Sequence, residues 1–197
     1  VNGIDVLAPL AGRDCIVLAI HPAMTFTGSD EDVTRLADTC FGITAADDVG
    51  YAIAQSLVLE IGGEPFRVTE DARRLYHAAL SHAGNHLVTL LGDALDALRV
   101  ALSGQELLGQ QLVDNHPGGL AERIVGPLAR AALENTLQRG QSALTGPVAR
   151  GDTDTLGGHL AALRAVDAQL AEAYRVNALR TAQRAHAPDG VMEVLAR

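Results

Sequence analysis

The sequence predicts a mostly α-helical protein in which a small α/β unit, residues 1–68, precedes an all-α domain, residues 69–197. Three observations support this fold class. Apolar runs rich in β-branched residues alternate with helical patterns in the first third of the chain. Residues 70–102 then continue without an internal Pro, and helical patterns dominate beyond them. Aromatic residues make up only 3% of the chain and Trp is absent, so Ala, Leu and Val must build the core, which favours closely packed helices.

The first unit is predicted to alternate between strands and helices. Residues 14–20, DCIVLAI, form a continuous apolar run, typical of a fully buried strand in a parallel sheet. Ser29, followed by acidic residues, predicts the start of a short helix. In the next helix Ile53, Leu57 and Ile61 would share one face. The expected order is strand 14–20, loop 21–28, helix 29–39, strand 40–44, helix 45–61 and strand 65–68.

The second part of the chain is predicted to contain only helices. Thr69 is placed to cap a helix that continues to about Leu102. Pro127 should kink the following helix or mark a second start. A later helical stretch is one helix or two, with a break near Val166–Asp167. The expected order is helix 70–102, a break over 103–119, helix 120–139, a Gly/Pro-rich loop 140–155, helix 156–187 and a tail with only a weak pattern.

Composition excludes several classes of function. The net charge is −9 and no run of basic residues exists, so nucleic acid and anionic membranes are poor partners. No signal peptide and no stretch of 18 apolar residues appears, and we expect a cytoplasmic, soluble protein. Lys is absent, so no lysine can form a Schiff base or donate a proton. Cys15 and Cys40 lack metal-type spacing and are expected to be reduced core residues.

A polar stripe lies on the long predicted helix. His77, Ser81 and Asn85 recur every four residues and so point in nearly one direction. The stripe could be a solvated face, a role for which His82 and His86 compete. It could instead be the polar wall of a substrate cleft, where His exchanges a proton near neutral pH while Ser and Asn orient a carbonyl or hydroxyl group.

Two loops offer further candidate residues. His21 directly follows the first predicted strand, at the end where open α/β sheets place ligands, and Thr25 adds a hydroxyl nearby. An ordinary strand exit would explain this pattern equally. In the loop 140–155, Arg150 could hold a substrate carboxylate in a bidentate fork, with Thr145 as a donor. The alternative is a helix connection in which Asp152 caps the next helix.

The common catalytic motifs are absent. The chain has no Walker loop, no serine-hydrolase elbow and no zinc motif, and no metal site is expected. His82 and His86 have the spacing of a zincin pair, but the residue after the first His is not Glu.

Four motifs in order, HPAMTFTG, FGIT, RLYHAALSHAGNHLVTLL and ALTGPVARGDTDTLGGHL, resemble a family of Rossmann-like proteins with a C-terminal helical domain, DUF2520. The resemblance covers roughly residues 5–175 and extends to the ketopantoate reductases and the 6-phosphogluconate dehydrogenase C-terminal-like superfamily. It implies an N-terminal Rossmann domain that binds NADP or NAD, followed by a helical domain that completes the cleft and makes a homodimer. No GxGxxG occurs in these residues, so the resemblance implies that the cofactor-binding turn lies upstream of residue 1.

The resemblance also implies roles for the stripe. Ketopantoate reductases use a lysine and an asparagine one turn apart on the corresponding helix, and Ser81 and Asn85 hold these two places. With no lysine, the proton donor would be His77 or His21.

Three functions therefore remain open. The chain is expected to be the C-terminal part of an NAD(P)-dependent oxidoreductase that reduces a small keto acid or imine. The missing lysine also fits a non-catalytic nucleotide- or metabolite-binding protein. A helical dimerisation domain, buried over 120–137 or 156–179, is compatible with either.

Overall fold

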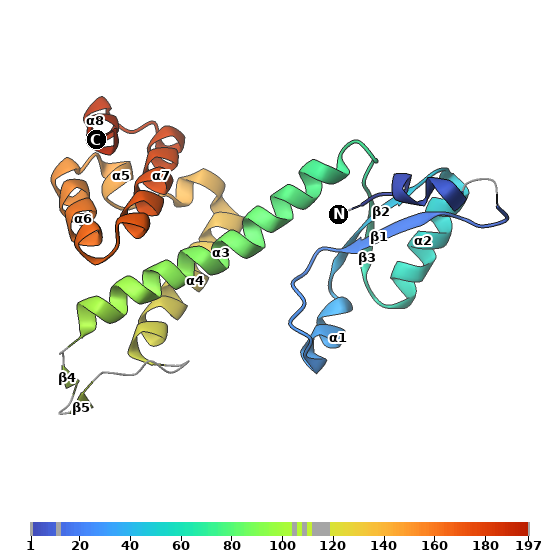
Figure 1. The fold of residues 1–197 in the computed structure, drawn as a ribbon, viewed down its shortest axis with the longest axis horizontal. Coiled ribbons are helices and arrows are strands. Elements are labelled where there is room, and N and C mark those ends of the chain that lie inside the picture. The colour runs from blue at the N-terminus through green and yellow to red at the C-terminus, as the bar shows by residue number, and fades with distance from the viewer. Residues whose placement is uncertain (1, 11–12, 104–105, 108–109, 112–118, 197) are drawn as a thin grey trace. The chain divides into compact units, whose positions relative to one another are not determined.

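The computed structural model describes residues 2–10, 13–103, 106–107, 110–111 and 119–196 (Figure 1). The chain forms two compact units, Val1–Val88 and Thr89–Arg197, and the helix α3 (Arg73–Leu102) contributes to both. The predicted fold class is confirmed, since a small α/β unit is followed by a helical unit. The predicted boundary after Val68 marks the change from strands to helix, and as a domain boundary it stays a prediction.

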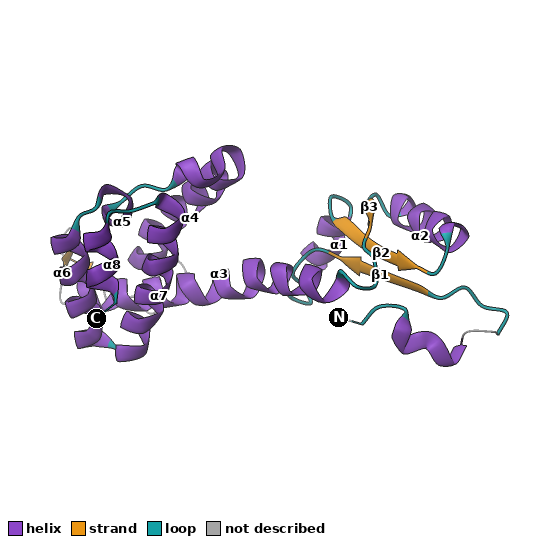
Figure 2. Ribbon diagram, turned by 90° about the horizontal axis from the view of Figure 1, so that it is seen from above, coloured by secondary structure: helices purple, strands orange, loops and turns teal. Residues whose placement is uncertain are grey.

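The sheet of the first unit has strand order β1-β2-β3 (Figure 2). β1 (Leu18–Pro22) pairs with β2 (Cys40–Ala45) in antiparallel direction, and β2 pairs with β3 (Glu64–Arg67) in parallel direction. A short 3-10 helix, Asp5–Leu10, precedes the sheet.

The prediction of a buried parallel strand over 14–20 is wrong. The strand is β1, which begins only at Leu18, lies at an edge of the sheet, runs antiparallel and is only partly buried. Ile20 within it and Ile16 before it are exposed. His21 and Pro22, expected in a loop, are its last two residues. A proline is tolerated because an edge strand leaves one row of N–H groups unpaired. Cys15 and Cys40 are free, as predicted, but both are exposed rather than in the core.

Two short helices accompany these strands. α1 (Asp30–Leu36) has Ser29 at its N-cap position, although the serine side chain makes no capping hydrogen bond. The buried carboxylate of Asp32 instead accepts the backbone N–H groups of Thr27 and Gly28, each at 2.7 Å. These hydrogen bonds keep the pKa of Asp32 below its ordinary value, against the opposing effect of desolvation, and so order the turn that enters the helix.

α2 (Asp48–Glu60) is capped by Asp47, whose side chain accepts the backbone N–H of Gly50. Its buried face consists of Gly50, Ala54 and Val58, so the predicted core face of Ile53, Leu57 and Ile61 is wrong. Ile53 and Leu57 each come one residue before a buried residue, so they point away from the buried face, and Ile61 is exposed with them. The helix approaches the sheet closely through small residues, a choice that periodicity alone does not reveal.

The two faces of the sheet pack against different helices. Phe41 and Ile43 of β2 are buried with α2 residues in the first core cluster. Gly42 and Thr44 alternate with them, and on that side they meet Tyr76 and Arg73 of α3. The second face therefore receives the first turn of α3.

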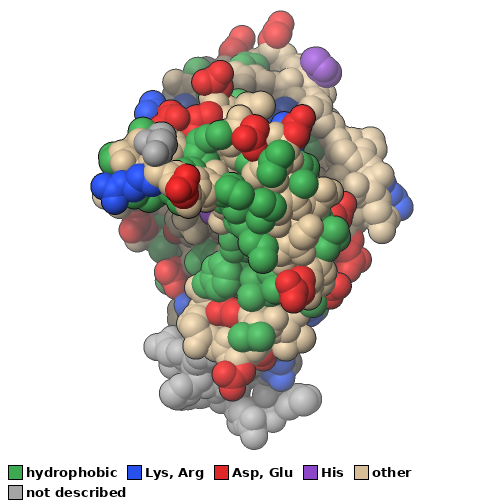
Figure 3. Space-filling view, turned by 90° about the vertical axis from the view of Figure 1, so that its right-hand side faces the viewer, with side chains coloured by type: hydrophobic (Ala, Val, Ile, Leu, Met, Phe, Trp, Pro, Cys, Tyr) green, Lys and Arg blue, Asp and Glu red, His purple; other side chains and the backbone are tan. Residues whose placement is uncertain are grey.

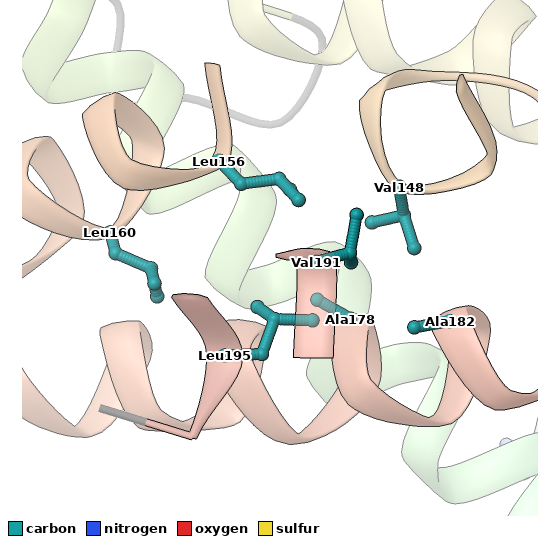
Figure 4. Close-up of a cluster of buried hydrophobic side chains, with 7 residues drawn as sticks. All are labelled: Val148, Leu156, Leu160, Ala178, Ala182, Val191 and Leu195. Carbon is teal, nitrogen blue, oxygen red and sulfur yellow. The ribbon is translucent and has the colours of Figure 1, made fainter. Parts of the chain in front are cut away.

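The second unit packs helices around one cluster of aliphatic side chains (Figure 4). α6 (Thr153–Val166) and α7 (Ala168–Ala185) meet at Asp167, which ends one helix and caps the next, so the predicted break is confirmed. The tail forms a helix, α8 (Asp189–Leu195), although its sequence pattern is weak. The cluster comprises Val148, Leu156, Leu160, Ala178, Ala182, Val191 and Leu195.

The remaining elements complete this unit. α4 (Leu120–Arg139) contains Pro127 within a single helix, and the predicted loop contains a 3-10 turn, Gly140–Ala143, and α5 (Pro147–Arg150). The predicted break includes a short ladder of β4 (Glu106–Leu107) with β5 (Gln110–Gln111), and its residues 104–105, 108–109 and 112–118 lie outside the described residues. In the described parts of the chain, no helix is both long and apolar enough to cross a membrane.

Gly42 should be intolerant of a side chain. A Cβ atom there would lie 3.0 Å from the Tyr76 ring and 3.0 Å from a Val68 methyl group. We expect Gly42→Ala to lower the free energy of unfolding by about 1–3 kcal/mol, because overpacking strains a filled interface. Urea denaturation followed by circular dichroism measures this. Gly92→Ala is the matched control, since nothing lies within 4 Å and alanine favours a helix by about 0.5–1 kcal/mol. Equal stability of the two variants would contradict the packing argument.

Candidate functional site

The structure brings His21 and His77 together on one face of the sheet. His21 lies at the end of β1, and His77 lies in the second turn of α3. Their ring centroids are 5.9 Å apart and the rings are nearly perpendicular, at 88°. Both side chains are half-buried. Two of the residues predicted from separate motifs therefore belong to one cluster.

Tyr76 is the third member of this cluster. Its hydroxyl lies 3.2 Å from Nδ1 of His21, and its ring packs edge-on against His21 and Phe66. Gly42 pairs with His21 across β1 and β2. It makes room for the Tyr76 ring because it has no Cβ atom.

The protonation states of this pair follow from their surroundings. Burial raises the pKa of the Tyr76 hydroxyl, so the phenol keeps its proton at neutral pH. Burial, and then the charge of Arg73, lower the pKa of His21 below its ordinary value of 6.5. In the described structure Nδ1 of His21 and the Tyr76 hydroxyl are hydrogen-bond partners, and the tautomer of His21 decides which of them donates. When the phenol donates to Nδ1, the neutral imidazole carries its proton on Nε2.

Arg73 lies beneath this pair. Its side chain is 2% exposed, and Nη1 donates to Thr44 Oγ1 at 2.7 Å and to the carbonyl of Ala19 at 3.4 Å. Thr44 Oγ1 donates in turn to the carbonyl of Val68 at 2.6 Å. This chain of hydrogen bonds joins α3 to all three strand regions, and it fixes the positions of Tyr76 and His77.

The rest of the predicted stripe continues along α3. Ser81 is half-buried and Asn85 is exposed. Thr25 is exposed, and its methyl group lies 3.6 Å from the point where a Cβ on Gly84 would be, so it lies against the same helix. The segment that leaves β1 therefore follows α3 from His77 to Gly84. The structure places His21 and Thr25 beside the stripe, where the imidazole of His21 and the hydroxyl of Thr25 add to its polar groups.

Thr145 and Arg150 belong to the second unit. Both are exposed, Thr145 just before α5 and Arg150 at its end. Asp152 caps α6, where its carboxylate accepts the N–H of Thr155 at 3.1 Å and the Thr155 hydroxyl at 2.7 Å. These hydrogen bonds lower the pKa of Asp152. The helix-connection interpretation of this loop therefore holds for Asp152, and a substrate role for Thr145 or Arg150 stays a prediction.

Two residues of the cluster were not predicted from the sequence. Tyr76 directly precedes His77 and is one of only three tyrosines, which was an available signal. Arg73 had none, because an arginine in the first turn of a helix is ordinarily solvated. Its burial depends on the sheet that it contacts.

Histidines elsewhere form two more pairs. Nδ1 of His82 lies 2.6 Å from Nδ1 of His86 on the exposed side of α3. Nδ1 of His159 lies 2.9 Å from the Tyr174 hydroxyl in the second unit. Among the described residues, no group of three or more His, Cys, Asp or Glu side chains could hold a metal ion.

Comparison with known proteins identifies one family. The family described as "Domain of unknown function (DUF2520)" matches residues 39–181. The fold is similar to protein TM1727 from Thermotoga maritima, with a TM-score of 0.60 and 22% identity over 85% of this chain. It is also similar to BF3122 from Bacteroides fragilis, which is named as a proposed NADP oxidoreductase, with a TM-score of 0.69 and 17% identity over 93% of this chain. The chain spans 62% of the length of each. No curated protein matches its sequence.

Tyr76 should determine the tautomer of His21. In Tyr76→Phe, Nδ1 loses its donor, so we expect the neutral ring to redistribute its proton between the two nitrogens. The pKa of His21 should also rise, because that hydrogen bond stabilises the neutral form. Long-range ¹H–¹⁵N NMR spectra report both, with His21→Gln to assign the signals.

Tyr174→Phe is the matched control for this substitution, since it removes the hydroxyl from the pair with His159. It should change the signals of His159 and leave those of His21 in place. Unchanged His21 signals in Tyr76→Phe would show that the hydroxyl does not donate to this ring.

Proposed function

Because the chain belongs to the DUF2520 family, we propose that it is the C-terminal part of a cytoplasmic NAD(P)-dependent oxidoreductase that reduces a small keto acid or imine. One observation carries the proposal. Two histidines from distant segments, His21 and His77, meet on one face of the sheet and are half-buried beside a polar stripe. The similar fold of the Bacteroides fragilis protein supports a nicotinamide cofactor, and ketopantoate reductase-like chemistry is the finer form of the proposal.

The described residues divide the work as follows. His77 donates the proton that a reduced carbonyl or imine requires, and Ser81 and Asn85 orient the accepting atom. His21 is the alternative donor, through the Nε2 proton that it carries when the Tyr76 hydroxyl donates to Nδ1. A bound nicotinamide supplies the hydride. Thr25 lies where it can contact a substrate beside α3, and Thr145 and Arg150 remain proposed substrate contacts from the second unit.

These residues fit the proton-transfer half of the reaction and not the binding of the whole cofactor. No glycine-rich phosphate turn occurs in the sequence, so we place the dinucleotide in a preceding Rossmann domain. An exposed apolar surface on α2 supports a preceding domain, which would cover it. Ile53 and Leu57 of α2 are 39% and 49% exposed and, with Val49, border a shallow cavity of about 570 Å³. Apolar side chains gather on the face shown in Figure 3.

A second candidate is a protein that binds a nucleotide or metabolite without turnover. The absence of lysine favours it, because the related ketopantoate reductases use one on the corresponding helix. Binding of NADPH to the protein made from its complete reading frame, without oxidation in the presence of a panel of keto acids and imines, would support this alternative.

We also propose a homodimer, with a second copy of the chain as the partner. α4 exposes apolar side chains along its whole length, and Leu128 and Leu137 are 68% and 78% exposed. A two-fold axis would bring identical apolar faces together, as an isologous interface requires. This would bury leucines that a monomer leaves in water.

His77→Ala tests the enzyme. In the protein made from its complete reading frame, NADPH oxidation should fall by roughly 10²–10⁴-fold in kcat, because general acid catalysis contributes about that much. His86→Ala, an exposed substitution on the same helix, should leave turnover within a few fold. Thermal unfolding checks that both variants are folded. A loss below tenfold in a folded His77→Ala protein would exclude this residue as the donor.

Leu128→Glu tests the assembly. Sedimentation velocity at micromolar concentration should show a dimer for the unmodified chain and a monomer for the variant, because a charge would be buried at the interface. Arg130→Glu, on the same helix, is the control for an altered charge alone. A monomeric unmodified chain would exclude the homodimer.

A further inference from the structure

The guanidinium group of Arg73 is a buried charge, and the residues that the structure describes offer it no counter-charge. The side chain is 2% exposed. Its acceptors, Thr44 Oγ1 and the carbonyl of Ala19, are both neutral and both bind Nη1. Its Nε is buried and has no hydrogen-bond partner in the part of the chain that the structure describes. Among the described residues, no carboxylate lies within ion-pair distance of it.

Such a group calls for an anion. Burying a charge is costly unless it is paired and hydrogen-bonded, and neutral acceptors offset only part of that cost. Because Nη1 is occupied by the sheet, Nε and Nη2 remain. These two N–H groups form one side of the planar guanidinium, and carboxylates bind that side in a fork.

A cavity reaches this residue. It has a volume of about 510 Å³ and includes Arg74 and Asp71 from the same segment of the chain. Glu70 also borders it, but its carboxylate accepts the N–H of Ile4 at 3.0 Å and lies against Gly3, so it is held by the N-terminal segment. The complete lining is Asn2, Gly3, Asp5, Val6, Glu70, Asp71, Arg73 and Arg74.

We propose that this cavity binds a small amino or imino acid, with the ligand's carboxylate on Arg73. The exposed carboxylates of Asp5 and Asp71 border the same space, so a ligand that also carries a positively charged nitrogen is favoured over a plain anion. The inference rests on the proposed function for its meaning, and it narrows the substrate from a keto acid or imine to the nitrogen-bearing class. It also assigns the carboxylate to Arg73, where sequence reasoning pointed to Arg150.

The site lies beside the histidine cluster. Ala19, whose carbonyl accepts from Arg73, is two residues before His21 in β1, and their strand partners Thr44 and Gly42 are on one face of β2. The charged and titratable groups that influence His21 are Arg73, His77 and Tyr76, all from α3, and the charged amino terminus of the chain. A ligand carboxylate that neutralises Arg73 therefore raises the pKa of His21.

The test is an NMR titration of His21 in the 197-residue chain, with alanine and then pyruvate as probes. These molecules share a carboxylate and differ in the charge at Cα. We expect alanine to raise the pKa of His21 by up to about 1 unit and to act at lower concentration than pyruvate. No change with either probe would overturn the site. A stronger effect of pyruvate would overturn the choice of an amino or imino acid.

Three variants identify the residue that binds. Arg73→Gln should abolish the effect of alanine, whereas Arg35→Gln, at an exposed position outside the cavity, and Arg150→Gln remove the same charge and should retain it. Persistence in a folded Arg73→Gln protein, or loss in Arg150→Gln, would overturn the assignment. If Arg73→Gln does not fold, the titration of the unmodified chain still decides whether a carboxylate binds.

The readout is separate from catalysis. It needs neither cofactor nor turnover, so a chain that binds alanine through Arg73 keeps this site even if the complete protein oxidises no NADPH. Turnover by the complete protein without any carboxylate effect on the pKa of His21 would support the enzyme and overturn the site at Arg73.

Discussion

The contact of Arg73 with the sheet is the interaction on which the first unit depends. One buried guanidinium donates to the hydroxyl of Thr44 and to the carbonyl of Ala19, and the Thr44 hydroxyl donates in turn to the carbonyl of Val68. A helix that begins at this residue has its first turns fixed against β1 and β2. The positions of Tyr76 and His77 follow from that attachment, because they are the next residues on the same side of the helix. A single charged side chain thus links the packing of the sheet to the geometry of the candidate site.

The sequence predicted the elements better than their environments. Residues 40–44, the long helix and the break at Asp167 were recognised from local signals, since strand propensity, helical period and capping residues act over a few positions. The burial of α2 was predicted on the wrong face. Its contact surface is made by Gly50 and Ala54, and close approach through small residues is decided by the partner, not by hydrophobicity.

The candidate site divides in the same way. His21, His77 and Ser81 were identified from spacing and from their position after a strand, and the structure brings the two histidines together. Tyr76 and Arg73 could not be ranked beforehand. The role of Tyr76 depends on Gly42 in a strand 34 residues earlier, and that of Arg73 depends on Thr44, 29 residues earlier. Such roles come from tertiary contacts between segments that a local pattern does not compare.

The core of the second unit has a consequence for how the protein is made. Val148 and Leu156 pack against Val191 and Leu195 of α8, which lies at the end of the described chain. Since synthesis proceeds from the N-terminus, this cluster stays open until the residues of α8 have left the ribosome. The first unit has no such dependence and can form earlier. A protein truncated before Asp189 would keep the sheet of the first unit, but the apolar side chains that α8 covers in the second unit would be exposed. Exposed apolar surface of this kind exposes a chain to aggregation and proteolysis, so a helix of only seven residues decides whether this unit persists in a cell.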